Sequence, residues 1–304
     1  MSLRAVPYLR FMINPLVPLL SVSLVIALGL SPSHGADKKI VLVAGSRSHG
    51  AGEHEFRAGC LVLQQCLNQV HGIRAMVCSN GWPNDVKVFD GAAAILIYAD
   101  GGTGHPFIQS DRLQVIGRLM KKGIGLGAVH YGVEVPKNQG GPEFLEWVGG
   151  YFETYWSVNP TWEANFARLP VHPITSGVKP FKIRDEWYYH MRFPEGMHKV
   201  TPLLSAIPPE STRGRPGDNS THGGNPEVQK HQGQPEHVMW CVERPDGGRG
   251  FGFTGGHFHQ NWGDENFRKV VLNAVLWIAR ARIPKNGVES RLTPAQVAVN
   301  LDSK

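Results

Sequence analysis

Cysteine is scarce in this sequence. Four cysteines are spread over 304 residues, and the first two, Cys60 and Cys66, lie on one predicted helix but point to different sides of it. Together with Cys78 and Cys241 they are too few and too scattered for a disulfide framework, although an oxidising compartment would permit one bridge. We therefore expect buried thiols.

Long basic runs are also missing. The formal net charge is +6, and no basic run is longer than the pairs Lys38-Lys39 and Lys121-Lys122. A surface that follows a phosphate backbone needs many more clustered cations. Nucleic acid is therefore not an expected partner.

A long apolar run occurs once, from Leu16 to Leu30, after Arg4 and Arg10. The small residues of Ser33-His34-Gly35 follow it, which is the pattern of a signal peptide cleaved before Ala36 or Asp37. The alternative is a retained membrane anchor, but the run is shorter than the roughly 20 residues that span a bilayer. We predict a signal peptide over residues 1–35 and a periplasmic or secreted protein with no stable membrane span after cleavage.

The next part of the chain alternates between apolar segments of strand length and segments of helical periodicity. Four strands are predicted, at Lys39–Ala44, Ile73–Cys78, Ala92–Ala99 and Ile124–Val129. Helices are predicted over Phe56–Val70 and after Ser110, which can cap the second helix. This alternation predicts an α/β fold, a flavodoxin-like doubly wound parallel sheet with helices on both faces and the first strand central.

The second half is less regular, and we predict extended β insertions there. Extended segments are expected at Phe181–Phe193, Val200–Ile207, His237–Glu243 and Gly250–Gly256. Residues 208–235 are rich in glycine and proline and predict a long surface loop. A helix is predicted over Asp264–Arg282, and Thr293-Pro294 can open a short one. The expected domain is 36–283, followed by a tail over 284–304.

Histidines and carboxylates cluster where the predicted strands end. The candidates are His54 after the first strand, Asp100 and His105 after the third, His130 and Glu134 after the fourth, and His257 and His259 after Gly250–Gly256. The carboxyl ends of the first, third and fourth strands should meet at one edge of a doubly wound sheet, and His257 and His259 can share one face of their extended segment because alternate residues of a strand point the same way, so we expect these groups to converge. Imidazoles with carboxylates suit a divalent metal ion such as zinc, and we predict His54, His130 and His257 as ligands. No H-E-x-x-H spacing occurs, and each histidine alone could be an ordinary surface or hydrogen-bonded core residue.

The segment Leu126–Gly132 runs from a buried strand through a tight turn. This is the position of a nucleophile elbow, but the projecting residue is His130 and not serine or cysteine. A histidine there can bind a metal or move protons, which argues against acyl transfer. The alternative is a structural turn whose histidine hydrogen-bonds a backbone carbonyl.

Further candidates complete the predicted site. His130, Glu134 and Glu186 are the expected catalytic groups, with Glu186 a candidate acid or base. Trp187 could stack on a sugar ring or simply pack in the core. The other expected substrate-binding residues are Asp100, His105, Tyr131 and His259.

Five segments in fixed order carry a resemblance to a known family. They are Gly52-Glu53-His54-Glu55, Val129-His130-Tyr131-Gly132, His172-Pro173-Ile174-Thr175-Ser176-Gly177, Asp185-Glu186-Trp187-Tyr188 and Gly250-Phe251-Gly252-Phe253-Thr254-Gly255-Gly256-His257. In this order the chain resembles the ThuA-like (trehalose-utilisation) family from about Lys39 to Arg282. The resemblance implies the class I glutamine amidotransferase-like fold without the amidotransferase cysteine.

The resemblance also implies a role in sugar catabolism, including routes through 3-keto-glycosides. Two positions depart from the family pattern: Asp100 replaces a histidine after the third strand, and Glu134 replaces a second histidine near the elbow. The expected protein is an exported metal-dependent enzyme that abstracts a proton beside a sugar carbonyl, with Glu134 or Glu186 as base. Alternatives are a non-catalytic carbohydrate-binding protein and, less favoured, an amidotransferase. A homo-oligomer is compatible with the sequence.

Overall fold

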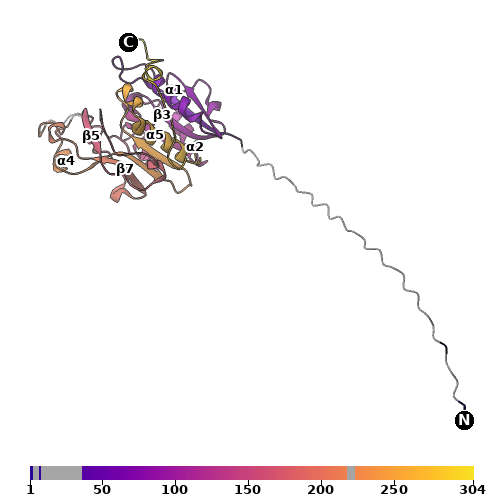
Figure 1. Ribbon diagram of the computed structural model, residues 1–304. Helices are drawn as coiled ribbons and strands as arrows, with labels where there is room; N and C mark the ends of the chain where they lie inside the picture. Colours follow the sequence, from indigo (N-terminus) through magenta and orange to yellow (C-terminus); the bar gives the residue numbers. More distant parts are fainter. Residues whose placement is uncertain (3–6, 8–35, 218–222) are drawn as a thin grey trace. The chain divides into compact units, whose positions relative to one another are not determined.

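A seven-stranded sheet in the order β2-β1-β3-β4-β9-β8-β7 organises residues 36–304 (Figure 1). The computed structural model describes residues 1–2, 7, 36–217 and 223–304, so the predicted signal peptide lies almost entirely outside the described residues. The parallel strands are β1 (Lys38–Ala44), β2 (Ile73–Cys78), β3 (Ala92–Tyr98), β4 (Gly125–Val129) and β9 (Arg249–Phe253). Antiparallel strands β8 (Glu236–Glu243) and β7 (Val200–Ala206) extend the sheet beyond β9.

The strand order confirms the doubly wound parallel sheet but corrects the predicted centre. Strands β1, β3 and β4 are adjacent and parallel, and the middle one of these three is β3 instead of β1, because β3 pairs with both of the others. The chain places β2 on one side of β1 and then returns to place β3 on the other side, which is the flavodoxin-like order. Apolar character could not reveal this, because all three strands are buried on both faces.

Helices cover both faces of the sheet. On one face, α1 (Phe56–Leu67) packs against β1 and β2 and α5 (Glu265–Ile278) against β3, β4 and β9, in a core that includes Ile40, Leu42 and Ala44 of β1. On the other, α2 (Arg112–Met120) and α3 (Gly141–Trp147) contribute buried side chains to a core that also contains Val41 and Val43 of β1. Alternate residues of a strand point to opposite faces, so each core layer receives every second side chain.

Several local elements differ from the sequence-based expectation. Ser110 has a φ of +52°, and Asp111 precedes α2 as its N-cap residue. The segment after β4 is one turn of 3₁₀ helix, His130–Val133. Strand β5 (Trp162–Phe166), which the sequence did not predict, forms a separate hairpin with β6 (Phe181–Asp185).

The predicted loop and tail each contain a short helix. Helix α4 (Pro226–Lys230) lies within residues 208–235, and Asn225 caps it by accepting the Val228 N–H. Helix α6 (Pro294–Val297) begins after Thr293 as predicted, with a capping box completed by Gln296. The chain then returns to the start of α1, where Glu55 accepts the N–H of Asp302 at 2.7 Å. In Figure 1 the C-terminus accordingly lies beside α1.

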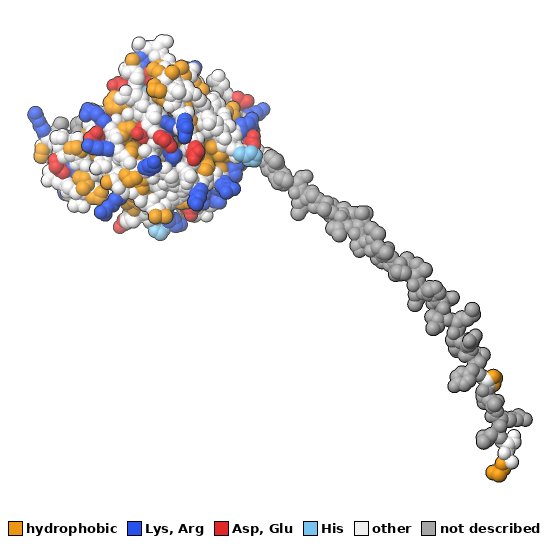
Figure 2. All heavy atoms as spheres, viewed as in Figure 1, with side chains coloured by type: hydrophobic (Ala, Val, Ile, Leu, Met, Phe, Trp, Pro, Cys, Tyr) orange, Lys and Arg blue, Asp and Glu red, His pale blue; other side chains and the backbone are white. Residues whose placement is uncertain are grey.

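The state of the cysteines and the distribution of surface charge agree with what the composition predicts. All four cysteines are free, and Cys60, Cys66 and Cys241 are buried. On the face drawn in Figure 2, lysine and arginine side chains are interspersed with carboxylates. Within the described residues, no helix combines the length and apolarity needed to cross a membrane.

Candidate functional site

The carboxyl ends of four parallel strands bring the predicted groups together. The loops after β1, β3, β4 and β9 carry His54, Asp100, His130 and His257, respectively. The first and last of these loops are joined directly, because His54 donates its backbone N–H to the carbonyl of His257 at 3.0 Å. The convergence predicted from parallel topology is therefore present.

Three histidines and one glutamate form the centre of this site. We call His54, His130, His257 and Glu186 the His/Glu cluster; one ligand-capable atom of each lies within 4.8 Å of the others. The Nε2 atoms of His54 and His130 are 3.0 Å apart, and His54 Nε2 is 3.1 Å from His257 Nδ1. Glu186 Oε2 lies 3.1 Å from His257 Nδ1 and 3.5 Å from His130 Nε2.

The outer ring nitrogens of two histidines are held by acceptors. His54 Nδ1 lies 3.1 Å from Asp100 Oδ1, and His130 Nδ1 lies 2.9 Å from the backbone carbonyl of Thr254. A carboxylate or carbonyl oxygen can only accept, so each Nδ1 carries the proton. In the neutral rings both Nε2 atoms then present lone pairs to each other.

Burial disfavours the charged form of these two rings. Desolvation lowers the pKa of His54, and it lowers the pKa of His130 well below its ordinary value, with the neighbouring histidines adding to the effect. For His257, burial lowers the pKa, but the hydrogen bond and charge of Glu186 outweigh it and raise the pKa overall. A proton shared between His54 and His130 is therefore disfavoured, and each Nε2 lone pair is available to accept a hydrogen bond, from His257 Nδ1 or the Tyr188 hydroxyl, or to bind a cation.

The spacing has room for one four-coordinate metal ion. Zinc–imidazole bonds of about 2.0–2.1 Å place ligand atoms roughly 3.3 Å apart in a tetrahedron. The distances of 3.0, 3.1, 3.1 and 3.5 Å between neighbouring members of the cluster fall around this value, and the remaining separations, His54 to Glu186 and His130 to His257, lie within 4.8 Å. Asp100 and Thr254 would serve as the hydrogen-bond acceptors that orient metal-bound histidines. Glu186, expected as an acid or base, lies where a fourth ligand would be.

Two of the cluster histidines occupy strained backbone positions. His54 has a φ of +46° and His130 a φ of +52°, both in the left-handed region that favours glycine. Such positions cost about 1–3 kcal/mol each and persist only where the surrounding structure holds them. At His130 this is the elbow predicted from the sequence, and it directs a fully buried imidazole into the cluster.

A buried carboxylate positions the loop that carries His257. Asp185 accepts the backbone N–H groups of Gly256 at 2.7 Å and His257 at 3.1 Å, and its side chain is fully buried. It immediately precedes Glu186 in the chain. Sequence reasoning missed this role, and also that of Thr254, because a backbone carbonyl and a loop-holding carboxylate have no spacing pattern of their own.

Glu134, Tyr131 and Tyr188 lie around the cluster. Burial, together with the charge of Glu186, raises the pKa of Glu134 to about 7. Burial and the nearby carboxylates raise the pKa of Tyr131 to about 12, and its ring lies 5.9 Å from that of His54. Tyr188, which was not predicted, places its hydroxyl 3.3 Å from His130 Nε2. The site thus combines a carboxyl group that titrates near neutrality with hydroxyl donors that stay protonated.

Three predicted substrate-binding residues are not brought into the cluster. His105 is fully buried, with Nε2 facing the Gly132 carbonyl and Nδ1 accepting the Phe107 N–H. Trp187 is also fully buried, so it offers no surface for a sugar ring. His259 turns away because β9 ends at Phe253, and its Nε2 lies 2.7 Å from the Val297 carbonyl. The alternation expected to align His257 with His259 does not extend past the strand.

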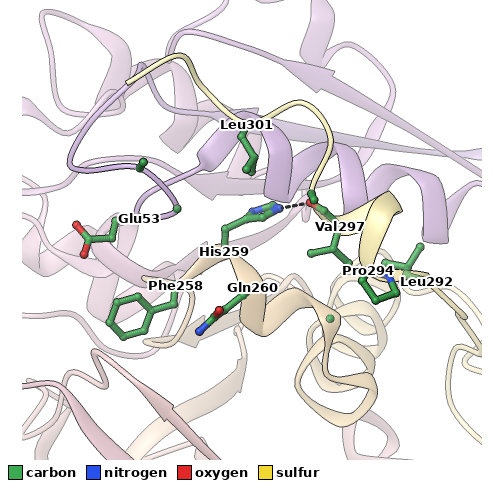
Figure 3. Close-up of a pocket in the computed structure, with 12 residues that line it drawn as sticks. Glu53, Phe258, His259, Gln260, Leu292, Pro294, Val297 and Leu301 are labelled. Carbon is green, nitrogen blue, oxygen red and sulfur yellow. Dashed lines mark hydrogen bonds between the residues drawn. The ribbon is translucent and has the colours of Figure 1, made fainter.

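A cavity of about 570 Å³ adjoins the site on the side of His259 (Figure 3). Its wall is largely apolar, and Glu53 lies at its edge with Oε1 3.6 Å from His257 Nε2. The other labelled lining residues are Phe258, Gln260, Leu292, Pro294, Val297 and Leu301. The C-terminal tail therefore builds one side of a pocket whose other side is the loop bearing His257.

Comparison with known proteins now identifies the family. The family model of ThuA, described as trehalose utilisation, matches residues 41–278. This chain belongs to the ThuA family. The predicted family and its broad relation to carbohydrate use are thereby confirmed. Comparison with curated proteins gives no match.

Crystal structures of ThuA-like proteins share the fold. One, from Bacteroides uniformis ATCC 8492, is 17% identical with a TM-score of 0.56 and covers 80% of this chain and 92% of its own. Another, from Parabacteroides merdae ATCC 43184, is 16% identical with a TM-score of 0.56 and covers 82% of this chain and 94% of its own. At these identities the similarity shows the fold, and the chemistry of the site must be argued from this chain's residues.

Proposed function

We propose that this ThuA protein is a metal-dependent enzyme that removes a proton beside the carbonyl of an oxidised sugar such as a 3-keto-glycoside. The observation that carries the proposal is the 3.0 Å approach of the Nε2 atoms of His54 and His130, whose Nδ1 atoms are already engaged. A cation between these two neutral imidazoles would be bound by both Nε2 lone pairs. His257 and Glu186 complete a donor set that suits zinc.

A bound divalent ion would supply positive charge to stabilise the negative charge that develops on the sugar's carbonyl oxygen. Glu134 acts as the base: a carboxyl group that titrates near pH 7 can accept a proton at neutral pH and later return it. The C–H bond beside the carbonyl breaks, its proton moves to the Glu134 carboxylate, and its electron pair passes toward the carbonyl oxygen. Tyr131, which stays protonated, can donate a hydrogen bond to that oxygen.

The same proton transfer begins two kinds of reaction. Return of the proton to a neighbouring atom gives an isomerisation, and loss of a leaving group from the adjacent carbon gives an elimination. The apolar cavity beside Glu53 is suited to the non-sugar part of a glycoside, because its lining is mainly aliphatic and aromatic. The rival proposal, a carbohydrate-binding protein that uses Trp187 for stacking, is disfavoured because that ring is fully buried.

The proposal is tested by metal analysis together with proton exchange. Untagged protein is loaded with zinc, dialysed and analysed by mass spectrometry of the metal, and a 3-keto-glycoside in heavy water is followed by NMR. We expect metal-dependent loss of the proton signal beside the carbonyl in the wild type. His54→Ala should lose both the metal at this site and the exchange, whereas Glu134→Gln should keep the metal and lose the exchange. Full exchange activity in metal-free protein would overturn the proposal.

A further inference from the structure

A second group of buried polar side chains lies outside the His/Glu cluster. His190 follows β6, Glu236 begins β8, and His231 follows α4. One ligand-capable atom of each lies within 4.8 Å of the others. We propose that His190, His231 and Glu236 form a second cation site, for one divalent ion of the zinc type.

One carboxylate oxygen faces both imidazoles. Glu236 Oε1 is 3.4 Å from His231 Nδ1 and 3.7 Å from His190 Nδ1. The other oxygen, Oε2, accepts the backbone N–H of His190 at 3.1 Å, which fixes the direction of the carboxylate. These separations are close to the roughly 3.3 Å expected between ligands of a tetrahedral zinc ion. Two imidazoles and one carboxylate leave a fourth position for water.

The carboxylate oxygen that faces the two imidazoles is buried. Among the described residues, Glu236 Oε1 has no hydrogen-bond partner, and the Glu236 and His190 side chains are only 7% and 5% exposed. Native proteins satisfy nearly all buried polar atoms, so a carboxylate oxygen that accepts no hydrogen bond and faces two imidazoles indicates a ligand. His190 also has a φ of +55°, a strained conformation of the same kind as those of His54 and His130.

A neighbouring arginine selects the kind of cation. Arg213 Nη1 lies 3.8 Å from Glu236 Oε1, while its Nε donates to Glu210 at 3.0 Å. The guanidinium offsets part of the negative charge of Glu236, so a calcium or magnesium ion, which relies on oxygen ligands, gains little here. An ion such as zinc, which bonds strongly to imidazole, loses less binding affinity from the nearby guanidinium charge. The site is therefore expected to prefer zinc over calcium and magnesium.

The location suggests what such an ion would do. His231 ends α4 within residues 208–235, whereas Glu236 belongs to the central sheet and His190 to the segment after β6. One ion would join these three parts of the fold. The His231 side chain is 48% exposed and supplies an entry path, while the other two ligands are buried. None of the three belongs to the His/Glu cluster, so the inference stands independently of the proposed function.

The test counts zinc in untagged full-length protein after dialysis and measures zinc affinity by isothermal titration calorimetry. The variants are His231→Ala, His54→Ala and their combination. Because His231 is half exposed, its removal should leave the fold intact, which circular dichroism checks. His198→Ala is the matched control, since His198 is an exposed histidine outside both groups.

We expect His231→Ala to lose one equivalent of zinc, the double variant to lose two, and His198→Ala to lose none. Calcium and magnesium should not compete at millimolar excess. If His231→Ala keeps the zinc content and affinity of the wild type, the second site does not exist, whatever His54→Ala does. If His54→Ala keeps its zinc and His231→Ala loses an equivalent, the second site is supported and the proposed function fails.

Discussion

The backbone N–H of His257 donates to the buried carboxylate of Asp185 at 3.1 Å. The same carboxylate accepts the N–H of Gly256 at 2.7 Å and that of Glu186, the next residue in the chain, at 2.8 Å. One side chain thus fixes two members of the His/Glu cluster that are far apart in sequence. Burial raises the pKa of Asp185, and these hydrogen bonds counteract the rise. Asp185 is therefore a positioning residue for the site.

Asp185→Asn should test this role. Asparagine keeps the size but replaces one acceptor oxygen with a donor, so at least one loop N–H loses its partner at a cost of about 1–3 kcal/mol. We expect a lower melting temperature and zinc affinity at the His/Glu cluster reduced by roughly 10–100-fold. Calorimetric titration and thermal unfolding measure both. Unchanged zinc affinity in a destabilised variant would mean that Asp185 supports the fold alone.

Asp100→Ala tests whether Asp100 orients His54 for zinc binding without contributing much to folding stability. Asp100 accepts from His54 Nδ1 at 3.1 Å, and its side chain is 40% exposed. Without this acceptor the His54 ring can adopt the other tautomer and turn, so zinc affinity should fall by about 10–100-fold. The free energy of unfolding of the metal-free protein should change by less than about 1 kcal/mol because the pair is partly exposed. Asp100→Asn, which retains an acceptor oxygen, is the control and should bind zinc more tightly than Asp100→Ala.

Parallel topology explains why most of the site could be predicted from sequence. His54 and His130 each follow a strand that the sequence predicts as buried and parallel, and the carboxyl ends of such strands share one edge of a sheet. His257 follows β9, which was predicted only as an extended segment and which pairs parallel to β4 at the same edge. The rule locates residues that directly follow strands. It does not locate Glu186, which reaches the cluster from an irregular segment after β6.

The errors in the prediction have equally local causes. His105 follows β3 as expected, but a short turn at Gly102–Gly104 directs its ring into the core beside Phe107 and Phe144. His259 was placed by strand alternation, yet Gly256 has a φ of +115°, so the chain no longer alternates there. The position of β3 between β1 and β4 was not predictable either, because the order of strands in a sheet depends on how the chain crosses over between them and not on their hydropathy.

Glu134→Gln should make the protein more stable and less active. A buried carboxyl group whose pKa is raised to about 7 from 4.5 destabilises the folded state as it ionises. The folded protein holds this proton between these two pH values, so the destabilisation begins above pH 4.5 and is complete above about 7. Glutamine removes it: the variant should be about 1–3 kcal/mol more stable at pH 8, with the gap closing toward pH 4.5. Urea unfolding of the metal-free proteins measures this.

The activity of the wild type should follow the same group. Because the base must be ionised, kcat/KM for the keto sugar should rise with pH and reach a plateau. The midpoint of this rise should lie at or below about 7, because a bound cation favours the ionised carboxylate and lowers the pKa of Glu134. Glu134→Gln should lower kcat by at least 100-fold with its zinc content unchanged. A variant that keeps its turnover would assign proton abstraction to another residue.

His105 provides a pH test that is independent of any metal. Its pKa is lowered to about 4 because the ring is fully buried, and its two ring nitrogens have hydrogen bonds to the backbone at Gly132 and Phe107. Below pH 6.5 the unfolded chain binds a proton at this position and the folded chain does not. The free energy of unfolding should therefore decrease as the pH falls from 6.5 to about 4. Each pH unit in this window should cost up to about 1.4 kcal/mol.

His105→Gln isolates that contribution. Glutamine cannot titrate, so the variant should be less stable than the wild type at pH 7 by about 1–3 kcal/mol through lost packing and hydrogen bonds. Toward pH 4.5 the difference should shrink, because acid destabilises only the wild type through this position. Urea unfolding of the metal-free proteins at pH 7, 5.5 and 4.5 gives the two curves. A difference that stays constant across this range would show that His105 is protonated in the folded state or reached by water.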